Sequence, residues 1–235
     1  MSSSKPPDNR PLENVAQARR ELDSLVVNIE LTLTSIIQGV ALYFLTDNAR
    51  GLLSALQFEY WIYIANGLLI IFLFWSRSVV HTLTVIRWPI EFSHNFLYIA
   101  CTLFEATTFT KVNDPFQWYA FNAIFAFAVW ALFVVDKKMI EFRRLEAISA
   151  EEAQLHQLIS TDQDWNIRLL VPLFILFPIV VAILIWICPH VLLQGHMHVV
   201  AGCVQFVALI GYLIYVIRFF GHLSPLILVW RSKME

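Results

Sequence analysis

Six long apolar stretches constrain this chain more than any other feature of its sequence. Each runs for about 20 residues, which is enough to cross about 30 Å of hydrocarbon as a helix rising 1.5 Å per residue. They are Leu25–Leu45, Phe58–Val80, Ile90–Phe109, Phe116–Val135, Ile167–Cys188 and His198–Phe220. A transmembrane barrel would need alternating segments of about ten residues, and the sequence has none. We therefore predict an all-α polytopic membrane protein with six transmembrane helices.

The composition supports a membrane location. Hydrophobic residues make up 58% of the chain and charged residues 14%, whereas soluble domains are about half apolar and about a quarter charged. The first 20 residues contain no apolar segment of the signal-peptide type. We expect a multi-pass protein of a bacterial inner membrane or an organelle membrane. The net charge of −2 does not indicate nucleic acid as a partner.

The distribution of basic residues predicts the orientation. Of the 16 Lys and Arg residues, only Arg50 and Lys111 would lie on one side of a six-span arrangement. Basic residues concentrate on the cytoplasmic side of membrane proteins. Both termini are therefore expected in the cytoplasm.

The polar segments between the spans divide the chain into five parts. We predict a disordered cytosolic tail (1–22), transmembrane helices 1–4 (23–135), a helical cytosolic linker (136–166), transmembrane helices 5–6 (167–222) and an interfacial C-terminal tail (223–235). The linker run Asp136–Ile159 is rich in helix formers and contains no Gly or Pro. It should extend the fourth helix and break at Ser160–Asp164.

The first span carries an unusual polar stripe. Spacings of three and four residues place one set of side chains on one helix face. The set is Asp23, Val27, Glu30, Thr34, Gln38 and Ala41. Such a face should not meet lipid, so Glu30, Thr34 and Gln38 could line a water-filled path with Ile37 as an apolar constriction. Alternatively, the hydroxyl and amide groups only form hydrogen bonds between helices.

The histidines suggest two further sites. One set would lie near the cytoplasmic ends of helices 2, 3 and 6, as a proton-sensing or metal-binding group beside Glu91: His81, His94 and His222. A second set surrounds the last outer loop and could bind copper or zinc: His190, His196 and His198. Neither set has the spacing of a known metal site. Haem would need two histidines that face each other across neighbouring helices, an arrangement that the sequence does not reveal. We therefore predict no cofactor.

Other residues add little to the functional interpretation. Glu105, near the outer end of helix 3, is predicted to be a solvated carboxylate at the interface, although it could also attract cations at an external mouth. The three cysteines have no metal-like spacing and suit small buried side chains. The sequence has no catalytic motif, phosphate loop or dinucleotide turn, and no Thr-Val-Gly-Tyr-Gly filter. We do not predict an enzyme.

Three short segments are similar to one known family. They are Phe72–Trp75 followed by His81, then Asn95–Leu97, and Trp118–Asn122. With the six-span plan, they resemble the endolysosomal transmembrane potassium-channel family, especially its bacterial six-helix members. The family signature Arg-x-x-x-Phe-Ser-Asp is replaced here by Arg20–Leu25, which has Arg, Asp and Ser in another order. The resemblance implies a tetramer whose first helices line the pore, with an apolar constriction in place of a carbonyl filter.

These observations favour a cation channel or leak, with potassium as the ion that the resemblance implies. Its partners would be the lipid bilayer, inorganic cations and further copies of the chain. One alternative is a non-conducting sensor or effector that signals through the basic run Lys137–Arg144. The other is a metal- or haem-binding redox protein that uses the histidine groups.

Overall fold

The computed structural model describes residues 10–89 and 91–232, and the side chains of residues 17–89 and 91–230. These ranges fold into helices and contain no strand. The α-helices are α1 (Arg10–Ser54), α2 (Trp61–Thr84), α3 (Phe92–Phe109), α4 (Pro115–Leu145), α5 (Ala150–Trp165), α6 (Val171–Ile187) and α7 (Met197–Ser232). A 3₁₀ turn precedes α2 (Phe58–Tyr60), and π-helical turns precede α6 (Asn166–Leu170) and α7 (His190–Gln194).

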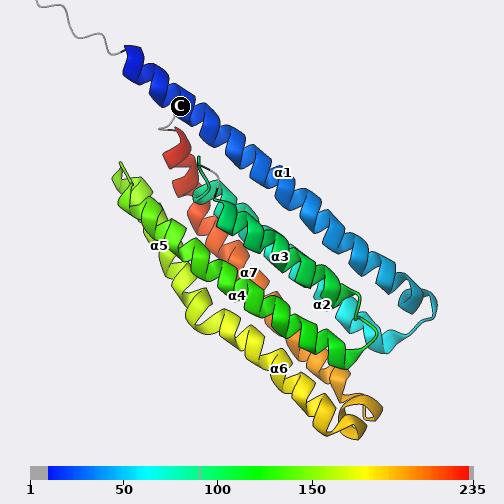
Figure 1. The fold of residues 1–235 in the computed structure, drawn as a ribbon. Helices are drawn as coiled ribbons and strands as arrows, with labels where there is room; N and C mark the ends of the chain where they lie inside the picture. Colours follow the sequence, from blue (N-terminus) through cyan, green and yellow to red (C-terminus); the bar gives the residue numbers. More distant parts are fainter. Residues whose placement is uncertain (1–9, 90, 233–235) are drawn as a thin grey trace, which may run out of the picture.

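The helices lie side by side in one elongated bundle (Figure 1). Successive helices run in opposite directions, except that α6 continues in the direction of α5. The start of α1, the end of α7 and the α2–α3 and α4–α5 connections therefore share one end, here called the termini end. The α1–α2, α3–α4 and α6–α7 connections share the opposite end.

Five helical segments within the described ranges are long and apolar enough to cross a membrane. They are Gln17–Ser54, Phe58–Thr84, Pro115–Leu145, Ala150–Ile187 and Met197–Trp230. The chain therefore has the character of a multi-pass integral membrane protein. The predicted span Ile90–Phe109 corresponds to α3, which is more polar and is not among the five. At 18 residues, α3 is about 27 Å long and packs between α4 and α1.

Capping residues explain where α4 and α5 begin. Asp114 accepts a hydrogen bond from the backbone N–H of Gln117 at 3.0 Å, and Pro115 occupies the first turn of α4. At the start of α5, Ser149 accepts from the backbone N–H of Glu152 at 3.1 Å. The Glu152 carboxylate in turn accepts from the backbone N–H of Ile148 at 3.0 Å. This reciprocal arrangement closely resembles a capping box and begins a new helix.

The predicted linker is wrong in its internal structure. One helix was expected through Asp136–Ile159 with a break at Ser160–Asp164, but α4 ends at Leu145 and the whole of Ser160–Asp164 is helical. The chain turns back just before the cap at Ser149, and α5 then packs against α4 and α7. The helix continues into α6 through the π-helical turn, which directly precedes Pro172.

The described residues of both predicted tails are helical. The disordered tail was expected to reach residue 22, but α1 begins at Arg10; residues 1–9 lie outside the described residues. The C-terminal tail was expected to lie in the membrane interface; its described residues belong to α7, which continues as a helix to Ser232. Leu223, Ile227 and Trp230 on that helix are buried in an apolar cluster at the termini end. Residues 233–235 also lie outside the described residues.

Candidate functional site

The polar stripe of α1 faces the interior of the bundle, as its spacing predicts. Glu30, Thr34 and Gln38 are each at most 5% exposed. The Asn95 side chain on α3 donates to Glu30 Oε1 at 2.7 Å. Ile37, beside the stripe, is partly buried and packs against the apolar core. The stripe therefore meets α3 within one chain.

Glu105 lies deeper in the bundle than the sequence predicted. It is completely buried rather than solvated at an interface. Gln38 Nε2 lies 3.2 Å from Glu105 Oε2 and 3.4 Å from the hydroxyl of Tyr98, so one amide joins two α3 side chains. Glu105 Oε1 has no hydrogen-bond partner among the described residues. A buried carboxyl with one amide partner is costly to ionise, so such a group in a membrane bundle suggests a function.

A second buried carboxylate lies towards the termini end. Asp136 on α4 is 4% exposed, and its Oδ1 lies 2.6 Å from His94 Nδ1 on α3. The same oxygen lies 3.8 Å from His81 Nε2 on α2, which is too far for a hydrogen bond. The two imidazole rings stack with centroids 4.8 Å apart, which leaves no space for a haem between them.

This cluster corrects one predicted group. His81 and His94 come together as expected, but their third member is Asp136, which the sequence reading had placed in the cytosolic linker. His222 was expected to join them, but it is exposed on α7 and lies outside the cluster. One ligand atom from each of His81, His94 and Asp136 could approach the same metal ion, because these atoms all lie within 4.8 Å of one another.

The space beside the cluster is small and polar. A cavity of about 20 Å³ is lined by Ser78, Tyr98 and the three cluster residues, among others. This volume is enough for one water molecule. Polar side chains thus follow α3 from Glu105 to the cluster.

Arg77 on α2 forms another wall of this cavity and carries a fixed positive charge. Its guanidinium donates to Asp162 on α5 at 2.6 Å, and both side chains are at most 10% exposed. Tyr215 on α7 donates to the other Asp162 oxygen at 2.6 Å. Three helices are therefore tied together next to the cluster.

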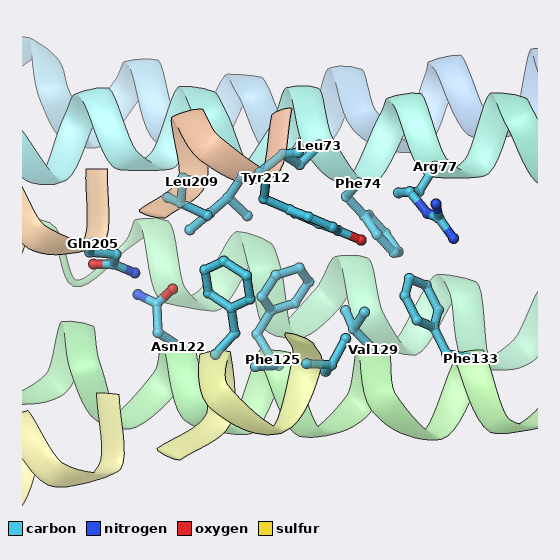
Figure 2. A pocket seen from close by; sticks show the side chains of 14 residues that line it. Leu73, Phe74, Arg77, Asn122, Phe125, Val129, Phe133, Gln205, Leu209 and Tyr212 are labelled. Carbon is cyan, nitrogen blue, oxygen red and sulfur yellow. The ribbon is translucent and has the colours of Figure 1, made fainter. Parts of the chain in front are cut away.

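A larger cavity of about 90 Å³ lies among α2, α4, α6 and α7. Figure 2 shows Arg77 at one end of it and the amides of Asn122 and Gln205 at the other, with aromatic and aliphatic side chains such as Phe125 and Tyr212 between them. Apolar cavities of this kind do not hold water well. Buried polar side chains line α3 from Glu105 to His94 more densely than they line this cavity.

The predicted outer histidine group is also only partly assembled. His196 and His198 meet at the opposite end of the bundle, where Glu59 from the turn before α2 joins them. His190 is exposed and pairs instead with Gln194 at 3.0 Å. Glu59 was absent from the sequence hypothesis because nothing in the spacing relates it to a loop more than a hundred residues away.

Two of the four basic residues in the run that the sensor alternative invoked form ion pairs within the chain, whereas Lys138 and Arg144 are exposed and Arg144 donates to the neutral amide of Gln157 at 2.6 Å. Lys137 pairs with Glu141 and Asp164, and Arg143 is buried and pairs with Glu146 at 3.1 Å. This leaves fewer free charges for anionic lipid than the sequence suggested.

Comparisons with known proteins do not assign this chain to a family. No family matches the sequence, no curated protein is similar to it, and no solved structure matches the fold. The interpretation of its function therefore depends on the buried polar residues along α3.

Proposed function

We propose that this protein is a six-span membrane protein, with both termini in the cytoplasm, that conducts cations along α3. The observation that carries the proposal is the pair of buried acidic sites on this route, Glu105 and the cluster of Asp136 with His81 and His94. Chains of Asp, Glu and His inside a membrane bundle are typical of proton and cation pathways.

The positions of these groups suit a stepwise path. Glu105 and His94 are separated by about 17 Å along the axis of α3, at 1.5 Å per residue. Gln38 and Tyr98 lie between them: the Tyr98 hydroxyl can relay a proton, and each side chain offers one oxygen to a cation. Because the polar groups are carboxylates, amides and hydroxyls, the path favours cations over anions.

The role of α1 changes under this proposal. The family resemblance implies a pore between the first helices of four copies. The buried stripe instead supports a path inside one protomer, with Glu30, Thr34 and Gln38 forming its α1 wall. Ile37 would form the apolar constriction beside this wall.

Flux through liposomes tests the proposal. Purified protein is reconstituted, and proton, potassium and sodium fluxes are measured for the wild type, Glu105→Gln and Asp136→Asn. Both substitutions keep the side-chain size and remove the ionisable carboxyl group, so we expect each to reduce cation flux at least about tenfold. Glu141→Gln is the matched control on α4, because its carboxylate is 48% exposed and lies off the path. Wild-type protein that carries none of these ions, or variants that conduct normally, would contradict the proposal.

Cysteine accessibility then separates the two pore geometries. Thr34→Cys lies on the buried face of α1, whereas Ile36→Cys is on the exposed face, where Ile36 is 63% exposed. Both are made after replacing the native cysteines, of which Cys188 and Cys203 are exposed. A path inside the protomer predicts that a small cationic thiol reagent blocks flux only through Thr34→Cys. Block only through Ile36→Cys would instead place the pore between copies of α1.

A further inference from the structure

Three side chains with metal-binding groups converge at the opposite end of the bundle from the termini. His196 Nδ1 lies 3.0 Å from Glu59 Oε2, and His198 Nε2 lies 4.0 Å from the same oxygen. The ligand atoms all lie within 4.8 Å of one another. Around a tetrahedral ion with bonds of about 2.0–2.1 Å, neighbouring ligand atoms would be about 3.3 Å apart. Small side-chain movements would therefore bring this set into coordinating geometry.

The loop before α7 is shaped to present the two histidines. Gly195 follows the π-helical turn, and a Cβ atom there would lie only 2.4 Å from the Val191 carbonyl oxygen. His196 then adopts a positive φ of 54°, which is uncommon for a residue with a side chain. Strained backbone of this kind occurs often at binding sites. The turn directs His196, which is 68% exposed, towards Glu59.

Close packing of α7 on α2 positions His198. A Cβ atom at Gly202 would lie 2.9 Å from Ile62 Cγ2, so the two helices approach closely at this glycine. Asn66 donates to the Gly202 carbonyl oxygen at 3.0 Å and secures the contact. His198, one turn before Gly202 on α7, is only 3% exposed and is held against Tyr63.

Hydrogen bonds around His198 favour a free Nε2. The hydroxyl of Tyr63 donates to the His198 carbonyl oxygen at 3.2 Å and lies 2.8 Å from Nδ1. In the tautomer that carries the proton on Nδ1, this nitrogen donates to the Tyr63 oxygen while the Tyr63 hydroxyl donates to the carbonyl, so both contacts are satisfied. The Nε2 lone pair then faces Glu59. A metal-binding histidine is commonly oriented in this way by a hydrogen bond to its other nitrogen.

We propose that Glu59, His196 and His198 form a binding site for a divalent transition metal of the zinc class. Two imidazole nitrogens and one carboxylate oxygen are ligands that zinc prefers, and three protein ligands leave the fourth position open to water or another ligand. The exposure of His196 and Glu59 lets the ion enter from solution. This site lies at the other end of the bundle from Asp136 and does not depend on the proposed cation path.

Zinc titration of the full-length protein tests the site. The protein is purified through a tag without histidines, stripped with a chelator, and titrated with Zn²⁺ by calorimetry and with Co²⁺ by visible absorption. We expect one ion per chain, and a ligand-field spectrum of tetrahedral Co²⁺. Glu59→Gln and His196→Ala should each weaken binding at least about tenfold, and Tyr63→Phe by about tenfold through loss of the orienting hydrogen bond.

His190→Ala is the matched control, because His190 is an exposed histidine of the same loop outside the cluster. Its affinity for zinc should equal that of the wild type. Glu59 is partly exposed and His196 is exposed, so their substitution should leave the fold intact. Zinc should raise the melting temperature of the wild type more than that of Glu59→Gln. Absence of zinc binding, or equal affinity in the wild type, Glu59→Gln and His196→Ala, overturns the proposal and leaves only a His196–Glu59 ion pair.

Discussion

The ion pair between Arg77 and Asp162 tests whether α5 belongs to the folded bundle or is a free cytosolic linker. The two groups lie 2.6 Å apart, and their side chains are 10% and 2% exposed. Removing one partner of a buried pair leaves the other charge uncompensated, which typically costs about 3–5 kcal/mol. In Asp162→Asn, Arg77 would keep its hydrogen bond to Gln163 at 3.2 Å. We therefore expect a loss near the lower limit, about 3 kcal/mol.

A double-mutant cycle isolates this interaction. Replacing both residues, as Arg77→Met with Asp162→Asn, removes the unpaired charge, so the double variant should lose less stability than Asp162→Asn alone. The free energy of unfolding is measured in mixed micelles by steric trapping. Glu141→Gln is the control, because Glu141 is 48% exposed and its partner Lys137 also pairs with Asp164, so the substitution should cost at most about 1 kcal/mol. A loss below about 1 kcal/mol in Asp162→Asn would refute the packed position of α5.

Three further substitutions test other parts of the fold in the same unfolding assay. Ser149→Ala removes the N-terminal cap of α5 and should lower the free energy of unfolding by about 1 kcal/mol, whereas Ser149→Gly should lower it less. Equal stability of Ser149→Ala and the wild type would argue against the cap. Trp230→Ala should cost about 3–5 kcal/mol, because Trp230 is 6% exposed and packs in the apolar cluster at the termini end; a neutral result would favour the interfacial tail. Gly202→Leu should separate α7 from α2 and lower the free energy of unfolding by at least about 1–3 kcal/mol. Gly211→Leu is the neutral control, because an added Cβ there would meet open space. Similar losses of stability in both variants would contradict the close contact at Gly202.

Patterns within one helix predicted the local features well. The spacing of three and four residues placed Glu30, Thr34 and Gln38 on one face of α1, and the structure buries that face. Long apolar runs predicted the five strongly hydrophobic segments, because the length and composition of a run can be taken directly from the sequence. The turn before α5 could also have been predicted, since Ser149 and Glu152 have the spacing of a capping box.

Contacts between distant segments were the main source of error. The charges around Asp136 suggested a solvated linker, yet tertiary packing places this carboxylate against His94 from another helix. Glu105 near a helix end resembled a surface carboxylate, and only the position of Gln38 on α1 reveals its burial. Helical periodicity carries no information about which helices are neighbours, so neither contact could be derived from it.

The two carboxyl groups on the α3 route differ in how well their surroundings stabilise a negative charge. The free energy of a cation on the proposed path should therefore differ between the two sites. Asp136 lies beside two histidines, which can stabilise its negative charge. Arg77 on the neighbouring wall is already paired with Asp162. Glu105 has only the amide of Gln38, and the described residues provide no cation near it. A cation that moves from Asp136 to Glu105 would therefore leave a carboxylate that has two histidine neighbours and reach one where the cation alone supplies the compensation. For this reason Glu105, the group with the fewest partners, is where the identity of the bound cation should matter most.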